Sequence, residues 1–428
     1  MHQMKIAILH YHLHPGGVTR IIESQVRSLS KAIENDKIRI LCGSSASESD
    51  FAEVPVIEDN CLFYDESVEV TARFTEKVAM IRSFIIQHAT GFILHCHNPN
   101  LGKNPALTLA IYQLARQGFN IVNHCHDFPE DRPENMQRLN SMIDQSGLSL
   151  REVLYPDLPG YHFAVLNSCD FNRLLENGVT PARVHLLPNP VSVNVDRKHE
   201  KRADIITRLG LDPGKKIITY PIRAIRRKNI GEFILMAVLF KETCQFNITQ
   251  APKNPVELPA YIQWKNFCEK NKIHVKFETG VTVNHEDLIR ISDFCITTSL
   301  REGFGMVYLE PWLAGTPVSG RNLPCITDDL RKYSLEFPRL YDRIEVKTDN
   351  GCYDFRDLDT GEQENLILGL LGSSREKEII LRANLFLNSL FNDVEPELIR
   401  KNRLIIRKYF SVTNYGKRLF TLYKNVSR

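Results

Sequence analysis

The sequence lacks the features that mark several large classes of protein. No apolar run reaches the roughly 18 residues that a membrane-spanning helix needs, and the first run is too short for a secretion signal. No two cysteines form a C-x-x-C pair, which argues against zinc ribbons and thioredoxin-like motifs. Lys and Arg number 54 against 51 Asp and Glu, so no basic excess points to nucleic acid as a partner.

Cysteine is too sparse for a disulfide scaffold. Ten cysteines are spread over 428 residues, and several of them, such as Cys96, Cys125 and Cys295, lie inside apolar runs. This pattern predicts buried, reduced thiols in a cytoplasmic protein. A peripheral contact with a membrane surface stays open as an alternative.

The first part of the chain alternates short apolar strands with helical patterns. Such alternation predicts a parallel, doubly wound α/β sheet, with ligands bound at the carboxyl ends of its strands. We expect strands at residues 5–10, 37–42, 91–96, 120–125, 162–167 and 183–187.

A second alternating series follows a Pro- and Asn-bearing segment at 188–200, which we interpret as a linker between domains. We expect strands at 216–220, 273–277 and 294–298 and helices at 231–240, 285–292 and 306–314. The predicted fold is therefore α/β, with two Rossmann-like domains facing each other across a cleft. The length of the chain fits two or three domains.

The C-terminal stretch is the one strongly charged part of the sequence. No acidic residue follows Glu397, whereas nine Lys or Arg occur there. We interpret it as a terminal helix pair with a solvated basic face; a patch for an anionic membrane or substrate is the alternative. The residues expected to pack are Leu404, Ile405, Ile406, Phe410, Leu419, Phe420, Leu422 and Tyr423.

The segment 297–318 carries the most informative pattern. Glu302 follows a predicted buried strand, and Glu310 lies inside the predicted helix, with seven residues between the two. Two glycines allow the backbone to approach a ligand, and a helix N-terminus favours a diphosphate. The expected backbone donors are those of Phe304, Gly305, Met306 and Val307. The two carboxylates suit sugar hydroxyls at Glu302 and ribose hydroxyls at Glu310.

This segment, EGFGMVYLE followed by AGTPV, resembles the E-x7-E motif of retaining GT-B glycosyltransferases of family 4. The resemblance spans nearly the whole chain. It implies a hexosyltransferase that moves a sugar from a UDP- or GDP-sugar to an acceptor hydroxyl, without a metal or other cofactor. It also implies an acceptor-side domain at 1–190, completed by a helix at 411–428, and a donor-side domain at 200–410.

The family places an Arg and a Lys after the first strand of its second domain. In YPIRAIRRKNIGEF these are Arg223 and Lys228, which would neutralise the departing diphosphate. Arg226 and Arg227 are more simply interpreted as solvated loop charges. Ile222 stands where the family usually has glycine, which leaves the local loop shape open.

Three further positions follow from the resemblance. Gly16 and Gly17 resemble the family's first glycine-rich loop, His126 its histidine at the donor sugar, and Thr282 the turn that holds the nucleotide base. H-x-H pairs at three strand ends could instead form a metal site, but no matching set of carboxylates accompanies them. We therefore predict no metal and treat the other histidines as packed or cleft-lining residues.

Two other functions stay open. A silent sugar-nucleotide-binding protein would keep the fold without turnover, and a glycoside phosphorylase would use phosphate in place of a nucleotide. Asp357 and Asp359 form a D-x-D pair that we interpret as a surface turn. The sequence does not identify the acceptor, which could be a glycan, a lipid or a small molecule. We expect it to bind at the stretch after His126.

Overall fold

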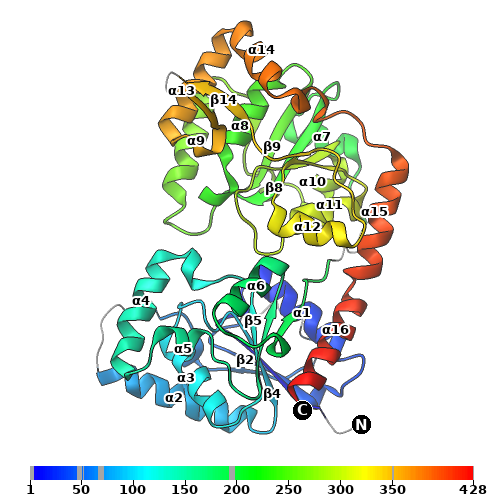
Figure 1. Cartoon of the computed structure of the whole chain (residues 1–428). Helices are drawn as coiled ribbons and strands as arrows, with labels where there is room; N and C mark the ends of the chain where they lie inside the picture. The colour runs from blue at the N-terminus through cyan, green and yellow to red at the C-terminus, as the bar shows by residue number, and fades with distance from the viewer. Residues whose placement is uncertain are drawn as a thin grey trace. The chain divides into compact units, whose positions relative to one another are not determined.

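A computed structural model describes residues 4–45, 51, 53–65, 72–191, 198–348 and 351–427. The chain divides into two compact units (Figure 1). The N-terminal unit comprises Met1–Pro190 and Phe410–Arg428, and the C-terminal unit comprises Val191–Tyr409. The predicted linker at 188–200 includes residues 192–197, which lie outside the described residues.

The N-terminal unit is built on a seven-stranded parallel sheet of order β3-β2-β1-β4-β5-β6-β7. Its strands are β1 (Ile6–His10), β2 (Ile38–Cys42), β3 (Val56–Glu58), β4 (Ile93–His97), β5 (Ile121–Cys125), β6 (Tyr161–Val165) and β7 (Val184–Leu186). The chain builds outward from β1 to one edge and then from β4 to the other edge, so the switch point lies between β1 and β4.

Helices cover both faces of this sheet because its strands are apolar on both sides. One core includes α2 (Ala72–Ala89), α3 (Pro105–Arg116), α5 (Leu150–Leu154) and α6 (Ser168–Glu176). The opposite core brings α1 (Gly17–Leu29) and the C-terminal helix α16 (Val412–Val426) together (Figure 1). A further helix, α4 (Pro133–Ile143), follows β5.

The C-terminal unit repeats this arrangement with a six-stranded parallel sheet of order β10-β9-β8-β11-β12-β13. Its strands are β8 (Lys216–Arg223), β9 (Cys244–Gln250), β10 (Val275–Lys276), β11 (Phe294–Thr297), β12 (Val318–Arg321) and β13 (Leu340–Tyr341). Here the switch point lies between β8 and β11. The predicted doubly wound α/β class is thus confirmed for both units.

Helices again follow the strands of the C-terminal unit. They are α7 (Arg202–Leu209), α8 (Ile230–Leu239), α9 (Leu258–Lys270), α10 (His285–Ile291), α11 (Glu310–Ala314), α12 (Pro324–Lys332), α13 (Thr360–Gly372), α14 (Ser374–Ala383) and α15 (Pro396–Tyr409). An antiparallel hairpin joins β14 (Glu345–Thr348) to β15 (Gly351–Asp354). The D-x-D pair falls beside it, where Asp359 caps α13 and Asp357 is exposed.

A buried arginine ties α8, β12 and the hairpin together. Arg321 is fully buried and forms two bonds of 2.8 Å to the Asp354 carboxylate. Its other side contacts the equally buried Glu232, with an Nε–Oε1 distance of 3.1 Å. Tyr341 donates a further hydrogen bond of 2.6 Å to Glu232. One arginine therefore contacts two carboxylates removed from water, and Arg356 adds a second cation 3.3 Å from Asp354.

We expect Arg321→Met to destabilise the C-terminal unit by about 3–5 kcal/mol, because it leaves Glu232 buried without its cation. Urea unfolding followed by tryptophan fluorescence would measure this, since both tryptophans lie in this unit. The control is Lys332→Ala, which removes a largely exposed ion pair with Asp329 and should cost less than about 1 kcal/mol. Equal costs for the two variants would contradict the prediction.

The C-terminal residues form two helices, as the sequence predicts. Most of the expected packing residues are buried in one unit or the other, including Ile406, Leu419 and Tyr423. Leu404 is the exception, because it lies on the outer side of α15 and is 66% exposed. Among the described helices, none has the length and apolarity of a membrane span.

The cysteines are only partly as expected, because Cys169 and Cys325 are disulfide-bonded and not reduced. Cys96, Cys125 and Cys295 are free and buried, and burial raises the pKa of each thiol. Cys352 contradicts the expectation of buried thiols, since it is free but exposed in the hairpin.

Candidate active site

A lysine and a glutamate meet at the switch point of the C-terminal unit. Lys228 ends the short 3-10 turn η6 (Arg226–Lys228) after β8, and its Nζ donates to Glu302 Oε1. Glu302 lies in the loop after β11. Its Oε1 also accepts from Ser299 Oγ at 2.6 Å, and its Oε2 accepts from Arg227 Nη1 at 3.2 Å. Two cations and a hydroxyl thus fix one carboxylate.

Hydrogen bonds between the two loops hold this cluster in place. Tyr220 in β8 and Thr298 at the end of β11 both donate to the Lys228 carbonyl, at 3.0 and 2.9 Å. The Leu300 amide donates to the Arg227 carbonyl at 2.9 Å. The Lys228 side chain is only 11% exposed, so its position depends on these contacts and not on solvent.

Burial and charge act in opposite directions on the glutamate. Burial alone would raise the pKa of Glu302, but Lys228, Arg227 and the hydrogen bonds outweigh it and hold the pKa below its usual value. Burial lowers the pKa of Lys228, against the opposing effect of Glu302. We take the carboxylate as ionised, because two cations contact it directly.

The glycine-rich turn after Glu302 differs from the continuous helix that the sequence predicts. Gly305 has a left-handed φ of 79°, and an added Cβ would lie 2.7 Å from Ile326 Cγ2. It starts a 3-10 turn, η8 (Met306–Tyr308), and the α-helix begins only at Glu310. Pro311 explains the break, because its ring excludes an α-helical bond to the Val307 carbonyl.

The predicted phosphate-binding residues surround this turn. The first backbone bond of η8 joins the Tyr308 amide to the Gly305 carbonyl, so the turn itself does not use the amides of Met306 and Val307. The side chains of Phe304 and Val307 are buried. Glu310 is the first residue of α11, whereas the sequence predicts it inside a helix; its Oε2 lies 3.5 Å from His285 Nε2.

Arg227, and not Arg223, is the arginine that contacts Glu302 in the described residues. Arg223 is the last residue of β8, and its side chain is exposed. Within the described residues it makes no contact with Glu302. Arg227, interpreted above as a solvated charge, contacts both Glu302 and the Arg301 carbonyl. Arg226 does fit the solvated interpretation, with 64% of its side chain exposed.

Thr282 lies at the carboxyl end of the neighbouring strands. It follows the 3-10 turn η7 (Thr279–Val281), and its hydroxyl donates to the Thr279 carbonyl at 3.3 Å. Thr279 is buried and donates to Asn247 Oδ1 of β9 at 3.1 Å, which anchors the turn to the sheet. Thr282 is exposed, and so is Val281 beside it, at 79%.

Gly16 and Gly17 lie at the switch point of the N-terminal unit. Gly17 starts α1, and Gly16 precedes it in extended conformation. An added Cβ would meet no other atom within 4 Å at Gly17, and at Gly16 only the His14 carbonyl at 3.7 Å. The fold itself therefore does not require glycine at either position, and it leaves the start of α1 open.

His126 is held in the same unit, in the loop after β5. Its ring is buried and its Nε2 lies 2.9 Å from His97 Nδ1, with the two rings stacked. Its backbone amide donates to Asn98 Oδ1 at 2.6 Å. Burial lowers the pKa of His126 to about 3, so the ring is neutral at physiological pH.

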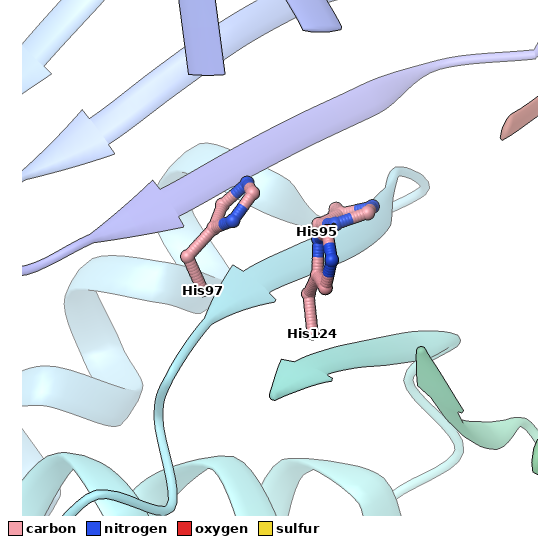
Figure 2. A group of neighbouring side chains, drawn as sticks. All are labelled: His95, His97 and His124. Carbon is pink, nitrogen blue, oxygen red and sulfur yellow. Dashed lines mark hydrogen bonds between the residues drawn. The ribbon is translucent and has the colours of Figure 1, made fainter. Parts of the chain in front are cut away.

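The neighbouring histidines were treated above as packed residues, and the structure gathers three of them. His95 and His97 from β4 lie beside His124 from β5, with one nitrogen of each within 4.8 Å of the others (Figure 2). Such spacing could suit a metal ion. No carboxylate belongs to the group, however, and a buried dication without an anionic ligand is costly.

Two doubly wound parallel sheets, together with the similarities to known proteins, define the chain as a glycosyltransferase with the GT-B fold, similar to family 4. A curated relative, mannosylglucosyl-3-phosphoglycerate synthase of Petrotoga mobilis, is 27% identical over an alignment 475 positions long. The alignment covers 98% of this chain and 91% of that protein. The expected family resemblance and enzyme class are confirmed.

Solved structures agree on the fold. A glycosyltransferase from Rickettsia africae has a TM-score of 0.65 at 14% identity and covers 100% of both chains. HepE of Anabaena, solved with UDP-glucose, has a TM-score of 0.62 at 12% identity and covers 99% of both chains. No protein-family profile matches the chain.

Proposed function

We propose that the chain transfers a sugar, with retention of configuration, from a nucleoside diphosphate sugar to a hydroxyl of an anionic acceptor. The observation that carries this proposal is the Lys228–Glu302–Arg227 cluster at the switch point of the C-terminal unit. Lys228 has three N–H donors, so it can keep Glu302 and still bind a diphosphate oxygen. The C-terminal unit is then the donor side, and HepE's complex with UDP-glucose supports a nucleoside diphosphate sugar as the donor.

In this mechanism the cations stabilise the departing diphosphate and no metal is needed. Lys228 and Arg223 neutralise the charge that develops as the glycosidic bond breaks, with Arg227 positioned to assist. The amides of Met306 and Val307 and the adjacent Gly305 and Phe304 cradle the diphosphate. The acceptor hydroxyl attacks from the face that the diphosphate leaves, and a leaving-group oxygen takes its proton.

The remaining predicted residues complete the donor site. Glu302 orients the sugar and supports positive charge on its ring, Glu310 binds the ribose hydroxyls, and Thr282 borders the base. Gly16, Gly17 and His126 belong to the N-terminal unit, where we place the acceptor; the resemblance assigns His126 to the donor sugar and the two glycines to the donor phosphates or the acceptor. The open start of α1 allows close approach of a ligand backbone or phosphate.

The relative's name supports an acceptor of a particular chemistry. A protein that makes mannosylglucosyl-3-phosphoglycerate handles a sugar chain on a phosphorylated glyceric acid. We infer that this chain extends a glycoside of the same class, in which a phosphate and a carboxylate sit close to the accepting sugar. The nearly neutral net charge of the chain does not argue against such a site, because a few local cations suffice to bind an anionic acceptor.

Thermal shift with UDP, GDP and inorganic phosphate tests the function. We expect one nucleotide at 100 times its Kd to stabilise the protein by about 2.7 kcal/mol. A screen of UDP- and GDP-sugars for slow hydrolysis then identifies the donor. Candidate acceptors are then tested with this donor, and transfer to glycosides of 3-phosphoglycerate is compared with transfer to matched glycosides of glycerate. Stabilisation by phosphate alone would favour the phosphorylase, and nucleotide binding without turnover would favour a silent binding protein.

A further inference from the structure

Six polar side chains form one continuous hydrogen-bonded chain inside the N-terminal unit. They come from α1, β4, β5, the loop after β5 and the C-terminal helix α16. The members are Gln25, His95, His97, His124, His126 and Tyr423. All are less than a tenth exposed. Figure 2 shows the central part, with two rings on β4 and the third on neighbouring β5.

The rings in this chain are neutral. Burial lowers the pKa of His95 and His126 to about 3 and holds those of His97 and His124 well below the ordinary value. In the described residues, no carboxylate is hydrogen-bonded to these rings. A neutral imidazole has one N–H donor and one acceptor nitrogen, so each bond constrains the next.

One branch of the chain runs from Gln25 to His126. The amide oxygen Oε1 of Gln25 lies 2.8 Å from His97 Nε2, and an oxygen can only accept, so this nitrogen carries the proton. His97 Nδ1 is then the acceptor in its 2.9 Å bond to His126 Nε2. His126 therefore holds its proton on Nε2, and its Nδ1 is a bare acceptor.

The other branch runs from the same amide in the opposite direction. Gln25 Nε2 donates to the Tyr423 hydroxyl at 2.8 Å, and the hydroxyl donates to His95 Nδ1 at 2.9 Å. His95 Nε2 then donates to His124 Nδ1 at 3.1 Å. The branch ends at His124 Nε2, which is buried and has no hydrogen-bond partner within the described residues. Both branches thus follow from one amide orientation.

We propose that Gln25 and His97 are positioning residues that fix the tautomer of His126, so that its Nδ1 accepts a hydrogen bond from a hydroxyl of the bound sugar. The identity of that ligand rests on the proposed function. The tautomer itself does not. Rotating the Gln25 amide by half a turn would reverse every bond in both branches and convert His126 Nδ1 into a donor. A single buried amide therefore decides whether this ring accepts or donates.

The same connectivity argues against a metal ion in the cluster. His95 and His97 use both ring nitrogens in hydrogen bonds, and His124 uses its Nδ1. Coordination by these three rings needs a lone pair from each, and His95 and His97 would first have to give up a bond. A metal would therefore break the chain that joins Gln25 to His126.

Nitrogen NMR of the full chain with ¹⁵N-labelled histidine tests the proposal without requiring turnover. The His126 signals are assigned by their loss in His126→Asn. We expect a protonated Nε2 and an unprotonated Nδ1 at His126 in the wild type. In Gln25→Leu, His97 loses its acceptor, and His126 should become a mixture of tautomers. His124→Leu is the matched control, because it removes only the far end of the His95 branch and keeps both partners of the Gln25 amide, so it should leave the His126 tautomer unchanged.

Kinetics and elemental analysis supply the remaining readouts. Once the donor is known, Gln25→Leu should reduce kcat/KM about tenfold, consistent with one hydrogen bond, whereas His124→Leu should not. A protonated Nδ1 at His126 in the wild type, an unchanged tautomer in Gln25→Leu, or a transition metal that copurifies and is lost in His124→Leu would each overturn the proposal. A correct tautomer in a protein without transferase activity would instead refute the proposed function.

Discussion

Lys228→Ala is expected to reduce sugar transfer at least about 10³-fold, because a cation that stabilises the leaving diphosphate is worth several kcal/mol in the transition state. The Lys228 ammonium is buried against Glu302, so no exposed cation can simply take its place. Arg227 still contacts Glu302 in the variant and limits the cost of the buried carboxylate. We therefore expect the C-terminal unit to stay folded with a lowered melting temperature.

Glu302→Ala should abolish transfer to a similar extent, for a different reason. It removes the group proposed to orient the sugar, and leaves Lys228 without its buried counter-charge. Glu302→Gln keeps the shape and the hydrogen bond from Ser299 but not the charge. If the carboxylate supports positive charge on the sugar ring, this variant should lose transfer while retaining most of its affinity for the nucleotide.

Arg226→Ala is the matched control for the loop, since its side chain is largely exposed and should affect transfer less than about threefold. Each variant is measured for initial rate, melting temperature and nucleotide-induced thermal shift. A folded Lys228→Ala protein that transfers sugar at the wild-type rate would refute the assignment. Loss of activity together with loss of the folded state would call for Lys228→Arg, which keeps the charge.

The positions of many strands could be predicted because buried parallel strands appear as short apolar runs between helices. β9 (Cys244–Gln250) has no counterpart among the predicted strands, since polar residues interrupt its apolar pattern. The structure shows how it tolerates them: Asn247 is fully buried and donates to Thr219 Oγ1 at 2.8 Å. A sequence pattern does not reveal that a neighbouring strand will satisfy a buried amide.

The site was predictable only where local sequence determines it. The position of Glu302 follows from a buried strand and a glycine turn, and Pro311 in the same segment could have indicated the late start of α11. The pairing of Glu302 with Arg227 depends on how two loops meet, and so it could not be found from spacing. The same holds for the histidine chain, whose members lie up to 398 residues apart.

The N-terminal unit is expected to lose its stability in mild acid before the C-terminal unit does. His10, His95 and His126 have pKa values lowered by burial to about 3, and those of His97 and His124 are lowered in the same direction. In the unfolded chain each ring has a pKa of about 6.5. As the pH falls below that value, the unfolded chain binds protons that the folded unit cannot, so stability is complete above about pH 6.5 and declines below it.

The expected loss is large. At pH 5 each ring with a pKa of about 3 costs about 2 kcal/mol, and three such rings cost roughly 6 kcal/mol. The whole free energy of unfolding of a typical domain is only about 5–15 kcal/mol. Hydrogen–deuterium exchange at pH 7.5 and pH 5, corrected for intrinsic rates, should show faster opening at pH 5 in peptides from β4 and β5 than in peptides from β8 and β11.

Two variants separate the titration from a general weakening of the unit. His124→Leu removes one buried ring, so the dependence of stability on pH should fall by about one proton. Tyr423→Phe removes a hydrogen-bond partner of His95 without removing a ring, so it should lower stability equally at both pH values. Unchanged protection of β4 and β5 at pH 5 would show that these rings accept protons in the folded state. The tautomer chain that joins Gln25 to His126 could not persist under that condition, because a protonated imidazole has no acceptor nitrogen.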